Sequence, residues 1–187
     1  MKIKKTIIVL LLCFLPIASF AQKVGEALSA WEEGYMDIHH INTGCGECAY
    51  LILPDGTTML IDAGENKAGN PRHVPPKPNA GRTPGEWIVD YIKAMAPAQN
   101  QKLDYALITH FHSDHMGGVL KMKNESGRYY NTGIIAVAEN LQISTLVDRG
   151  FPDYKFLVDT EDKMIKNYFN FLHFTKRRIN AEQFRPG

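Results

Sequence analysis

Three short runs of strand-forming residues open the regularly patterned part of the chain. They cover Gly34 to Ile41, Cys48 to Leu53 and Thr57 to Ile61. A glycine-rich turn separates the first two runs, and a Pro-Asp-Gly turn separates the last two. The spacing predicts an antiparallel β-meander, which ends where Asp62-Ala63-Gly64 leaves a buried strand.

The pattern then changes to a loop and a helix. Residues 65–84 are rich in proline and glycine and too long for a simple connector, which indicates a functional or mobile surface loop. Pro84-Gly85-Glu86 can start a helix, and Pro97 can end it. Apolar side chains recur between them at helical spacing, at Trp87, Ile88, Tyr91, Ile92 and Met95.

Helix and strand alternate in the rest of the chain. We expect a strand over Tyr105 to Thr109, a helix that begins after Gly117-Gly118, a strand over Ile143 to Val147 and a helix over Thr160 to Phe174. We expect the chain to end at Phe184-Arg185-Pro186-Gly187 without a closing strand or helix before these residues. Strands first and helix–strand alternation afterwards predict one α/β layered domain. A content of 44% hydrophobic and 22% charged residues suits such a globular domain.

The N-terminus has the three parts of a secretory signal. Lys2, Lys4 and Lys5 are basic, residues 7–17 are apolar apart from Pro16, and Ser19-Phe20-Ala21 supplies small residues for cleavage. The apolar run is shorter than the roughly 20 residues that a bilayer span needs. We expect a signal peptide at residues 1–21, a mature domain at residues 22–187 without a stable membrane anchor, and a periplasmic or extracellular location.

The charge of the mature chain gives no global attraction to nucleic acid. The whole chain has 21 basic and 20 acidic side chains; losing the three signal lysines leaves a net charge of −2 with neutral histidines. The basic run Lys176-Arg177-Arg178 is typical of the solvated end of a helix.

Cys45 and Cys48 lie in a glycine-rich turn between two predicted strands. An exported protein can form a disulfide, but a redox-active pair would open a helix within a βαβ unit. Two cysteines are also too few for a structural zinc site. We interpret both as small, partly buried thiols, and the sequence leaves open whether they are bridged.

A compact set of metal-ligand residues follows the strand predicted over residues 105–109. His110, His112, Asp114 and His115 lie within six residues. Residues two apart in an extended segment point to the same side, so His110 and His112 can converge on one ion. Asp114 and His115 lie where the chain turns and can face a second ion. Imidazole with carboxylate suits zinc, and also iron or manganese. The alternative is a histidine-rich surface loop, but the end of an apolar strand is where open α/β proteins place their sites.

The segment Thr109 to Gly118, Thr-His-Phe-His-Ser-Asp-His-Met-Gly-Gly, resembles the signature loop of the metallo-β-lactamase superfamily, and Asp62-Ala63-Gly64 is similar to that family's first motif. Residues 42–49, with the Pro-Asp-Gly turn that follows, resemble the branch typified by the hydrolase domain of DNA-uptake competence proteins. The resemblance spans residues 36–120. It implies an αββα sandwich, of which this chain carries the first β-half with its helices and lacks the second half.

The same resemblance implies roles for single residues. His110 and His112 would bind a first zinc ion, and Asp114 and His115 a second one. Asp62 would orient a ligand loop, so that Asp62 and Asp114 both contribute to catalysis. Hydroxide on the metal would attack an ester, amide or phosphodiester of a small-molecule, peptide or nucleic-acid substrate.

The family pattern also needs ligands that the sequence after His115 does not offer: a third ligand for the first metal, a bridging aspartate and a final histidine. We therefore expect a domain that is incomplete at its C-terminus or a diverged remnant. Apolar side chains of the first β-half would then lack a covering sheet, and residues 22–187 alone would be poorly soluble or molten and inactive; these side chains are Leu51, Leu53, Leu60 and Leu107.

Three functions compete on this basis. The first is an exported metal-dependent hydrolase. The second is a non-catalytic metal-binding or partner-binding remnant of the fold. The third is a secreted interaction protein whose histidine cluster merely buffers metal. Fold does not decide between them.

Four further histidines have structural interpretations. Alternation in the first strand predicts one of His39 and His40 inside and the other outside. His73 is expected in an exposed loop, and His173 is expected to pack within an aromatic helix.

We predict that an export-competent host removes residues 1–21. The intact mass of the recovered protein should correspond to a chain that begins at Gln22, because the small residues before it suit a signal peptidase. A membrane-bound chain that still begins at Met1 would refute the prediction.

Overall fold

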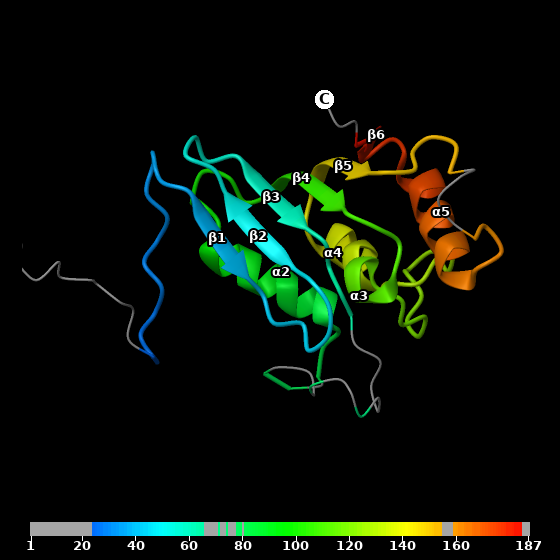
Figure 1. Cartoon of the computed structure of the whole chain (residues 1–187), viewed down its shortest axis with the longest axis horizontal. Coiled ribbons are helices and arrows are strands. Elements are labelled where there is room, and N and C mark those ends of the chain that lie inside the picture. The colour runs from blue at the N-terminus through cyan, green and yellow to red at the C-terminus, as the bar shows by residue number, and fades with distance from the viewer. Residues whose placement is uncertain are drawn as a thin grey trace, which may run out of the picture.

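A computed structural model of the chain describes residues 24–65, 71, 74, 78–79, 81–154 and 159–184. Its strands are β1 (Asp37–His40), β2 (Ala49–Ile52), β3 (Thr58–Ile61), β4 (Leu103–Ile108), β5 (Ile143–Asp148) and β6 (Asn180–Gln183), and its helices are α2 (Pro84–Met95), α3 (Ser113–Met116), α4 (Gly133–Asn140) and α5 (Lys163–Thr175) (Figure 1). The predicted signal peptide, His73 and most of the proline-rich loop lie outside the described residues.

The six strands form one sheet in the order in which they occur along the chain. β1, β2 and β3 pair antiparallel, which confirms the predicted meander. The pairs β3–β4, β4–β5 and β5–β6 are parallel, and helices lie in the connections between these strands. The described part of the chain is therefore a mixed α/β sheet with its parallel half on the C-terminal side.

Two sequence predictions were wrong at the boundaries of elements. No helix follows Gly117-Gly118; the chain runs irregularly, turns near Asn124 and Gly127, and enters α4 only at Gly133. Hydrogen bonds from the backbone N–H groups after Gly117 go to side chains and not to a helix. The C-terminal residues also contain a closing strand, because β6 pairs with β5 although its own sequence, Asn-Ala-Glu-Gln, has little strand propensity.

The helix over Pro84 to Met95 begins as its sequence predicts. The Thr83 hydroxyl accepts the Glu86 N–H, and the Glu86 carboxylate accepts the Thr83 N–H, so a capping box closes the first turn. Pro84 stands at the first helical position, where its missing N–H has no cost. Among the described residues, every helix falls short of the length and apolarity that a membrane crossing requires.

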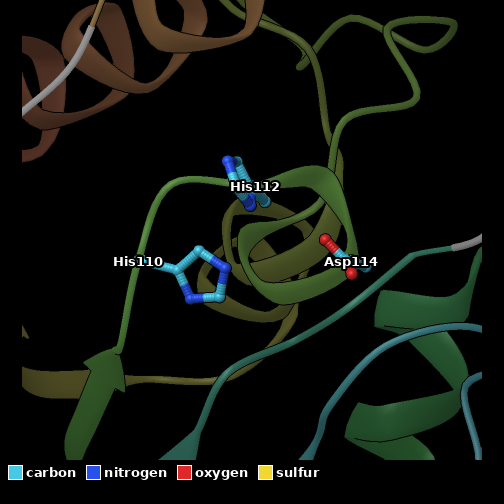
Figure 2. Close-up of side chains that lie close together, drawn as sticks. All are labelled: His110, His112 and Asp114. Atoms are coloured by element: carbon cyan, nitrogen blue, oxygen red, sulfur yellow. The ribbon is translucent and has the colours of Figure 1, made fainter.

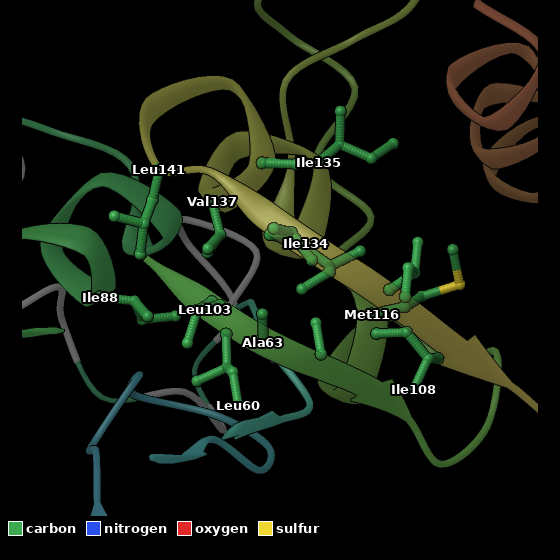
Figure 3. Close-up of a cluster of buried hydrophobic side chains, with 14 of the residues drawn as sticks. Leu60, Ala63, Ile88, Leu103, Ile108, Met116, Ile134, Ile135, Val137 and Leu141 are labelled. Carbon is green, nitrogen blue, oxygen red and sulfur yellow. The ribbon is translucent and has the colours of Figure 1, made fainter. Parts of the chain in front are cut away.

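The core lies between one face of the sheet and the helices α2 and α4 (Figure 3). Leu60 of β3 and Ala106 of β4 are paired in register and fully buried. From the helices, Ile88, Ile92 and Ile134 fill the space above them. This face needs no second sheet to be covered.

The opposite face of the sheet is apolar and only partly covered. Leu51, Met59 and Tyr105 lie side by side on it in register, and Tyr105 is 44% exposed. Of the four leucines expected to lack a covering sheet, Leu51, Leu53 and Leu107 are half-buried, but Leu60 points to the helix side. The expectation was wrong for Leu60 because a strand alternates its side chains between two faces, and the helices cover one of them.

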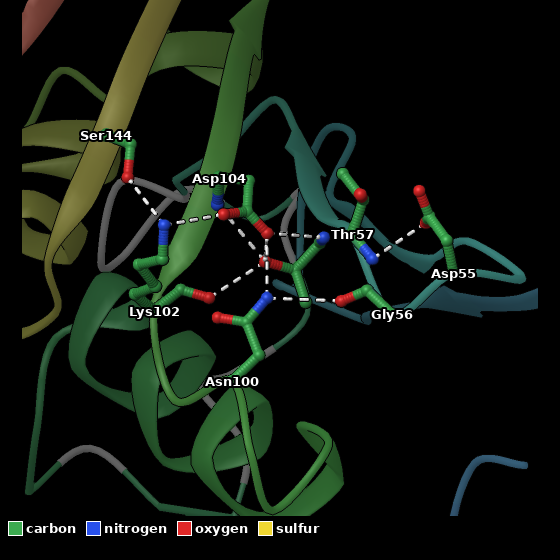
Figure 4. Close-up of polar contacts among 8 residues, drawn as sticks. Asp55, Gly56, Thr57, Asn100, Lys102, Asp104 and Ser144 are labelled. Atoms are coloured by element: carbon green, nitrogen blue, oxygen red, sulfur yellow. Dashed lines mark hydrogen bonds and ion pairs between the residues drawn. The ribbon is translucent and has the colours of Figure 1, made fainter. Parts of the chain in front are cut away.

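A polar network ties β3 and β4 together at their N-terminal ends (Figure 4). Asp104 Oδ2 accepts the Thr58 N–H at 3.0 Å and an Asn100 Nδ2–H at 2.7 Å, and Oδ1 lies 2.7 Å from Lys102 Nζ. Burial opposes ionisation of Asp104, but these donors outweigh it and hold its pKa below the ordinary value. The carboxylate therefore stabilises the fold above the unfolded-state pKa of about 3.9, and this contribution is lost as the pH falls through the lower folded-state value.

Adjacent residues on β3 test the two faces of the sheet. Leu60→Ala should lower the free energy of unfolding by about 2–5 kcal/mol, because it removes a fully buried side chain from the helix-side core. Met59→Ala, the matched change on the open face, should cost much less. Chemical denaturation followed by circular dichroism measures both. Equal losses would show that the open face is as well packed as the core.

Candidate metal centre

The carboxyl ends of three parallel strands meet at one edge of the sheet. Asp62 follows β3, Thr109 follows β4, and Asp148 ends β5. Open α/β sheets bind their ligands beyond this edge. The histidine-rich segment therefore leaves the sheet at the edge where α/β proteins usually bind ligands.

His110, His112 and Asp114 converge on one point in this segment (Figure 2). One ligand atom from each of the three lies within 4.8 Å of the others. The rings of His110 and His112 have their centroids 4.7 Å apart, and α3 turns Asp114 back towards them. The sequence predicted His110 and His112 on one ion and Asp114 on another; the structure places all three in a single group.

Asp62 holds both ends of the histidine segment. Its Oδ1 accepts the Thr109 N–H at 2.8 Å, and its Oδ2 accepts the Thr109 hydroxyl at 2.6 Å and lies 2.7 Å from His115 Nδ1. Because an ionised carboxylate only accepts, the His115 proton lies on Nδ1. His115 Nε2 then presents its lone pair on the side of Asp114, whose Oδ2 is 3.9 Å away. Asp62 is 1% exposed and has a φ of 59°, a left-handed conformation that aspartate tolerates better than most residues.

Glu65 is a second buried carboxylate, which the sequence analysis missed. Its Oε2 accepts the N–H groups of Gly118 and Val119 at 3.2 and 2.9 Å, and also the Thr132 hydroxyl at the start of α4. Its own N–H donates to the Ser113 carbonyl. Burial raises the pKa of Glu65, and its hydrogen bonds oppose this shift. The signal that could have revealed it is its place three residues after Asp62 in the same strand-leaving segment.

Glycines let three backbone segments approach one another around Asp114 and Met116. A Cβ on Gly46 would lie 1.7 Å from the Asp114 carbonyl oxygen, and a Cβ on Gly117 would lie 2.4 Å from the Cα of Gly133. Both glycines have positive φ, 88° and 90°. Only glycine fits these two positions, so the turn between β1 and β2 and the start of α4 both pack directly on the histidine segment.

The donor set fits a divalent transition-metal ion. Two ligands held at about 2.0–2.2 Å from one ion are at most about 4.4 Å apart, so small side-chain movements bring His110, His112 and Asp114 onto it. Burial, followed by the neighbouring His115 and His112, lowers the pKa of His110. The lowered pKa favours the neutral imidazole, which is the form that binds metal.

The later bridging aspartate remains unmatched among the described residues. Asp148 occupies the end of the next strand, but both of its oxygens are engaged by other groups, and the metal-ligand group around His110 does not include it. No local sequence signal marks Asp148 as a metal ligand, because the segment Val147-Asp148-Arg149-Gly150 matches none of the motifs quoted above.

Comparison with known protein families agrees with this geometry. Residues 42–127 match the family model of the metallo-beta-lactamase superfamily. This part of the chain belongs to the metallo-beta-lactamase superfamily. The match runs from the turn that packs on Asp114 through the whole histidine segment. No curated protein matches the sequence, so the resemblance to competence-protein hydrolase domains stays a prediction.

The metal-ligand group around His110 includes neither the two described cysteines nor the described histidines of the first strand and the last helix. Cys45 and Cys48 are both free, and burial raises the pKa of the Cys48 thiol, which makes it a poor nucleophile. As predicted, the first strand has one histidine inside and one outside: the side chain of His39 is 9% exposed and that of His40 is 77% exposed. His173 was expected to be packed but is exposed beside Phe174.

We predict that Asp62→Asn weakens zinc binding by about 10–100-fold. The amide places an N–H where Thr109 and His115 both donate, so His115 loses the partner that fixes its tautomer. Competition with a chromophoric chelator measures the affinity. Asp104→Asn is the matched control, because it removes a carboxylate network at the other end of β4 and should lower stability while zinc affinity stays at the wild-type value.

Proposed function

We propose that this chain is an exported metal-dependent hydrolase that cleaves an ester, amide or phosphodiester bond. The observation that carries the proposal is the convergence of His110, His112 and Asp114 within 4.8 Å, next to a histidine that Asp62 orients. Zinc suits this donor set best. The superfamily match adds a fold on which metal-dependent chemistry is usual.

The residues divide the work of such a site. His110, His112 and Asp114 would hold the ion, and His115 would offer Nε2 to the same ion. A bound zinc ion lowers the pKa of a coordinated water to about 7 and polarises the bond under attack. Asp62 keeps His115 and the Thr109 backbone in place during this chemistry. Asp114 belongs to the cluster and its side chain is half-exposed, so its carboxylate oxygen that does not hold the ion could accept a proton from water.

A second candidate function is a non-catalytic metal-binding remnant of the fold. The engagement of Asp148 by two tyrosine hydroxyls and two backbone N–H groups favours it, because this carboxylate is not free to bridge metals. Under this alternative the cluster binds zinc but does not turn over substrate. Zinc content and hydrolysis therefore have to be measured on the same protein.

We predict weak zinc binding, with at most one ion per chain, which is lost when His110 and His112 are both changed to alanine. Four clustered ligands without a bridging carboxylate should leave the ion labile. Elemental analysis after dialysis measures the content. The matched control is His40→Ala with His173→Ala, two exposed histidines outside the cluster, which should retain wild-type zinc.

Turnover decides between the two functions. A hydrolase should cleave at least one of three chromogenic substrates, an aryl ester, a β-lactam or an aryl phosphodiester. A chelator should abolish this activity, and added zinc should restore it. Wild-type zinc content without turnover would favour the remnant, and equal zinc content in the His110/His112 variant would show that the cluster is not the site.

A further inference from the structure

A cavity of about 400 Å³ opens beside the metal cluster. His110 and His112 form part of its wall. The turn after β5 and the first residues of α5 form the rest, and the other lining residues are Phe111, Arg149, Asp159, Asp162, Met164 and Ile165. A substrate whose scissile bond lies at the metal cluster would place its neighbouring group in this cavity.

Arg149 reaches the cavity from a backbone that is anchored on both sides. Asp148, directly before it, is 1% exposed. Asp148 Oδ1 accepts the N–H of Gly150 at 2.8 Å and the N–H of Phe151 at 2.7 Å, so the carboxylate closes a tight turn around Arg149. The backbone that carries the Arg149 side chain is therefore already ordered. Ligand binding then has less conformational entropy to remove.

The other oxygen of Asp148 fixes this turn to the rest of the cavity wall. Oδ2 accepts the hydroxyls of Tyr154 at 2.6 Å and Tyr168 at 2.8 Å. Burial raises the pKa of both tyrosines, so both remain hydrogen-bond donors at neutral pH. Their rings pack on Phe111, which lies between the two ligand histidines, with centroids 5.9 and 5.8 Å away. The position of the Arg149 turn is thereby coupled to the position of the metal ligands.

The charged side chains of the cavity differ in whether they already have hydrogen-bond partners within the protein. Asp162 accepts the N–H groups of Met164 and Ile165 and caps α5, and Asp159 accepts the N–H of Glu161. Within the described ranges, the Arg149 side chain has no hydrogen bond or ion pair, and it is exposed. Its planar guanidinium has five N–H donors that match a carboxylate or phosphate group.

We infer that Arg149 binds a singly charged anionic group of the substrate, a carboxylate or a phosphodiester attached to an apolar moiety. The inference deepens the proposed hydrolase function and rests on it. Phe111, Met164 and Ile165 supply apolar contact for the moiety. The two aspartates at the same wall disfavour groups with several negative charges.

Calorimetric titration of the zinc-loaded chain with three small probes tests this role. Phenylacetate and phenylacetamide have the same shape and differ in charge, and diphenyl phosphate is a monoanionic diester. Arg149→Ala should weaken phenylacetate binding about ten-fold and leave phenylacetamide binding unchanged. Arg149→Lys should give an intermediate loss, because it keeps the charge without the fork. Arg177→Ala, the same change at an exposed arginine outside the cavity, should bind as the wild type.

The diphenyl phosphate titration identifies the class of anion. A loss for both anions supports recognition of either class, and a loss for one alone supports that class. Unchanged phenylacetate and diphenyl phosphate binding in Arg149→Ala, an equal loss for phenylacetamide, or no anion binding by the wild type would overturn the inference. Zinc content and circular dichroism confirm that each variant is loaded and folded.

The experiments distinguish failure of the hydrolase proposal from failure of the inference about Arg149. Anion binding that depends on Arg149, in a chain that binds zinc but never turns over substrate, would support the inference and contradict the hydrolase. If the wild type binds no zinc, the same titrations of the metal-free chain still report on Arg149.

Discussion

The contact between Asp62 and His115 is the constraint on which the candidate site depends. It joins the residue that leaves β3 to a residue that lies 53 positions later, and the same carboxylate also holds the backbone and hydroxyl of Thr109. The Asp62 side chain thus contacts both ends of the histidine segment. Without these contacts, no interaction would hold the segment in the conformation that brings His110, His112 and Asp114 together. Burying the Asp62 carboxylate is tolerated because both of its oxygens have hydrogen-bond donors.

Glu65, like Asp62, is a buried carboxylate that holds separate segments of the chain together. It reaches the chain after the histidine segment and the start of α4, a helix for which Thr132 provides no side-chain cap. A negative charge near a helix N-terminus is favourable, which offsets part of the cost of burying Glu65. Two carboxylates three residues apart therefore fix the histidine segment to the sheet on one side and to a helix on the other.

Local patterns predicted much of this structure, and tertiary contacts account for what they missed. The meander, the capped helix α2, the strand β5 and the helix α5 follow from turn residues and periodicity, and the histidine motif contains the three residues that lie together in the candidate site. The chain after Gly117 was misassigned because its backbone donors bind Glu65 and Thr132, which no local pattern encodes. β6 was missed because its pairing with β5, and not its composition, makes it a strand. Arg149 and Asp148 escaped notice for a related reason, since only the fold brings the end of β5 beside His110.

The strand order has a consequence for how the site comes into being. Each strand of the sheet pairs only with strands that are its immediate neighbours in the chain. The antiparallel pairs of the meander close over short turns, and each parallel strand then adds over a longer connection that contains a helix, so the sheet can grow in one direction as the polypeptide lengthens. The histidine segment directly follows the fourth strand, so its ligands can be drawn together as soon as that strand adds to the meander. The wall that contains Arg149 forms one strand later. The topology therefore allows metal capture to precede completion of the cavity during folding.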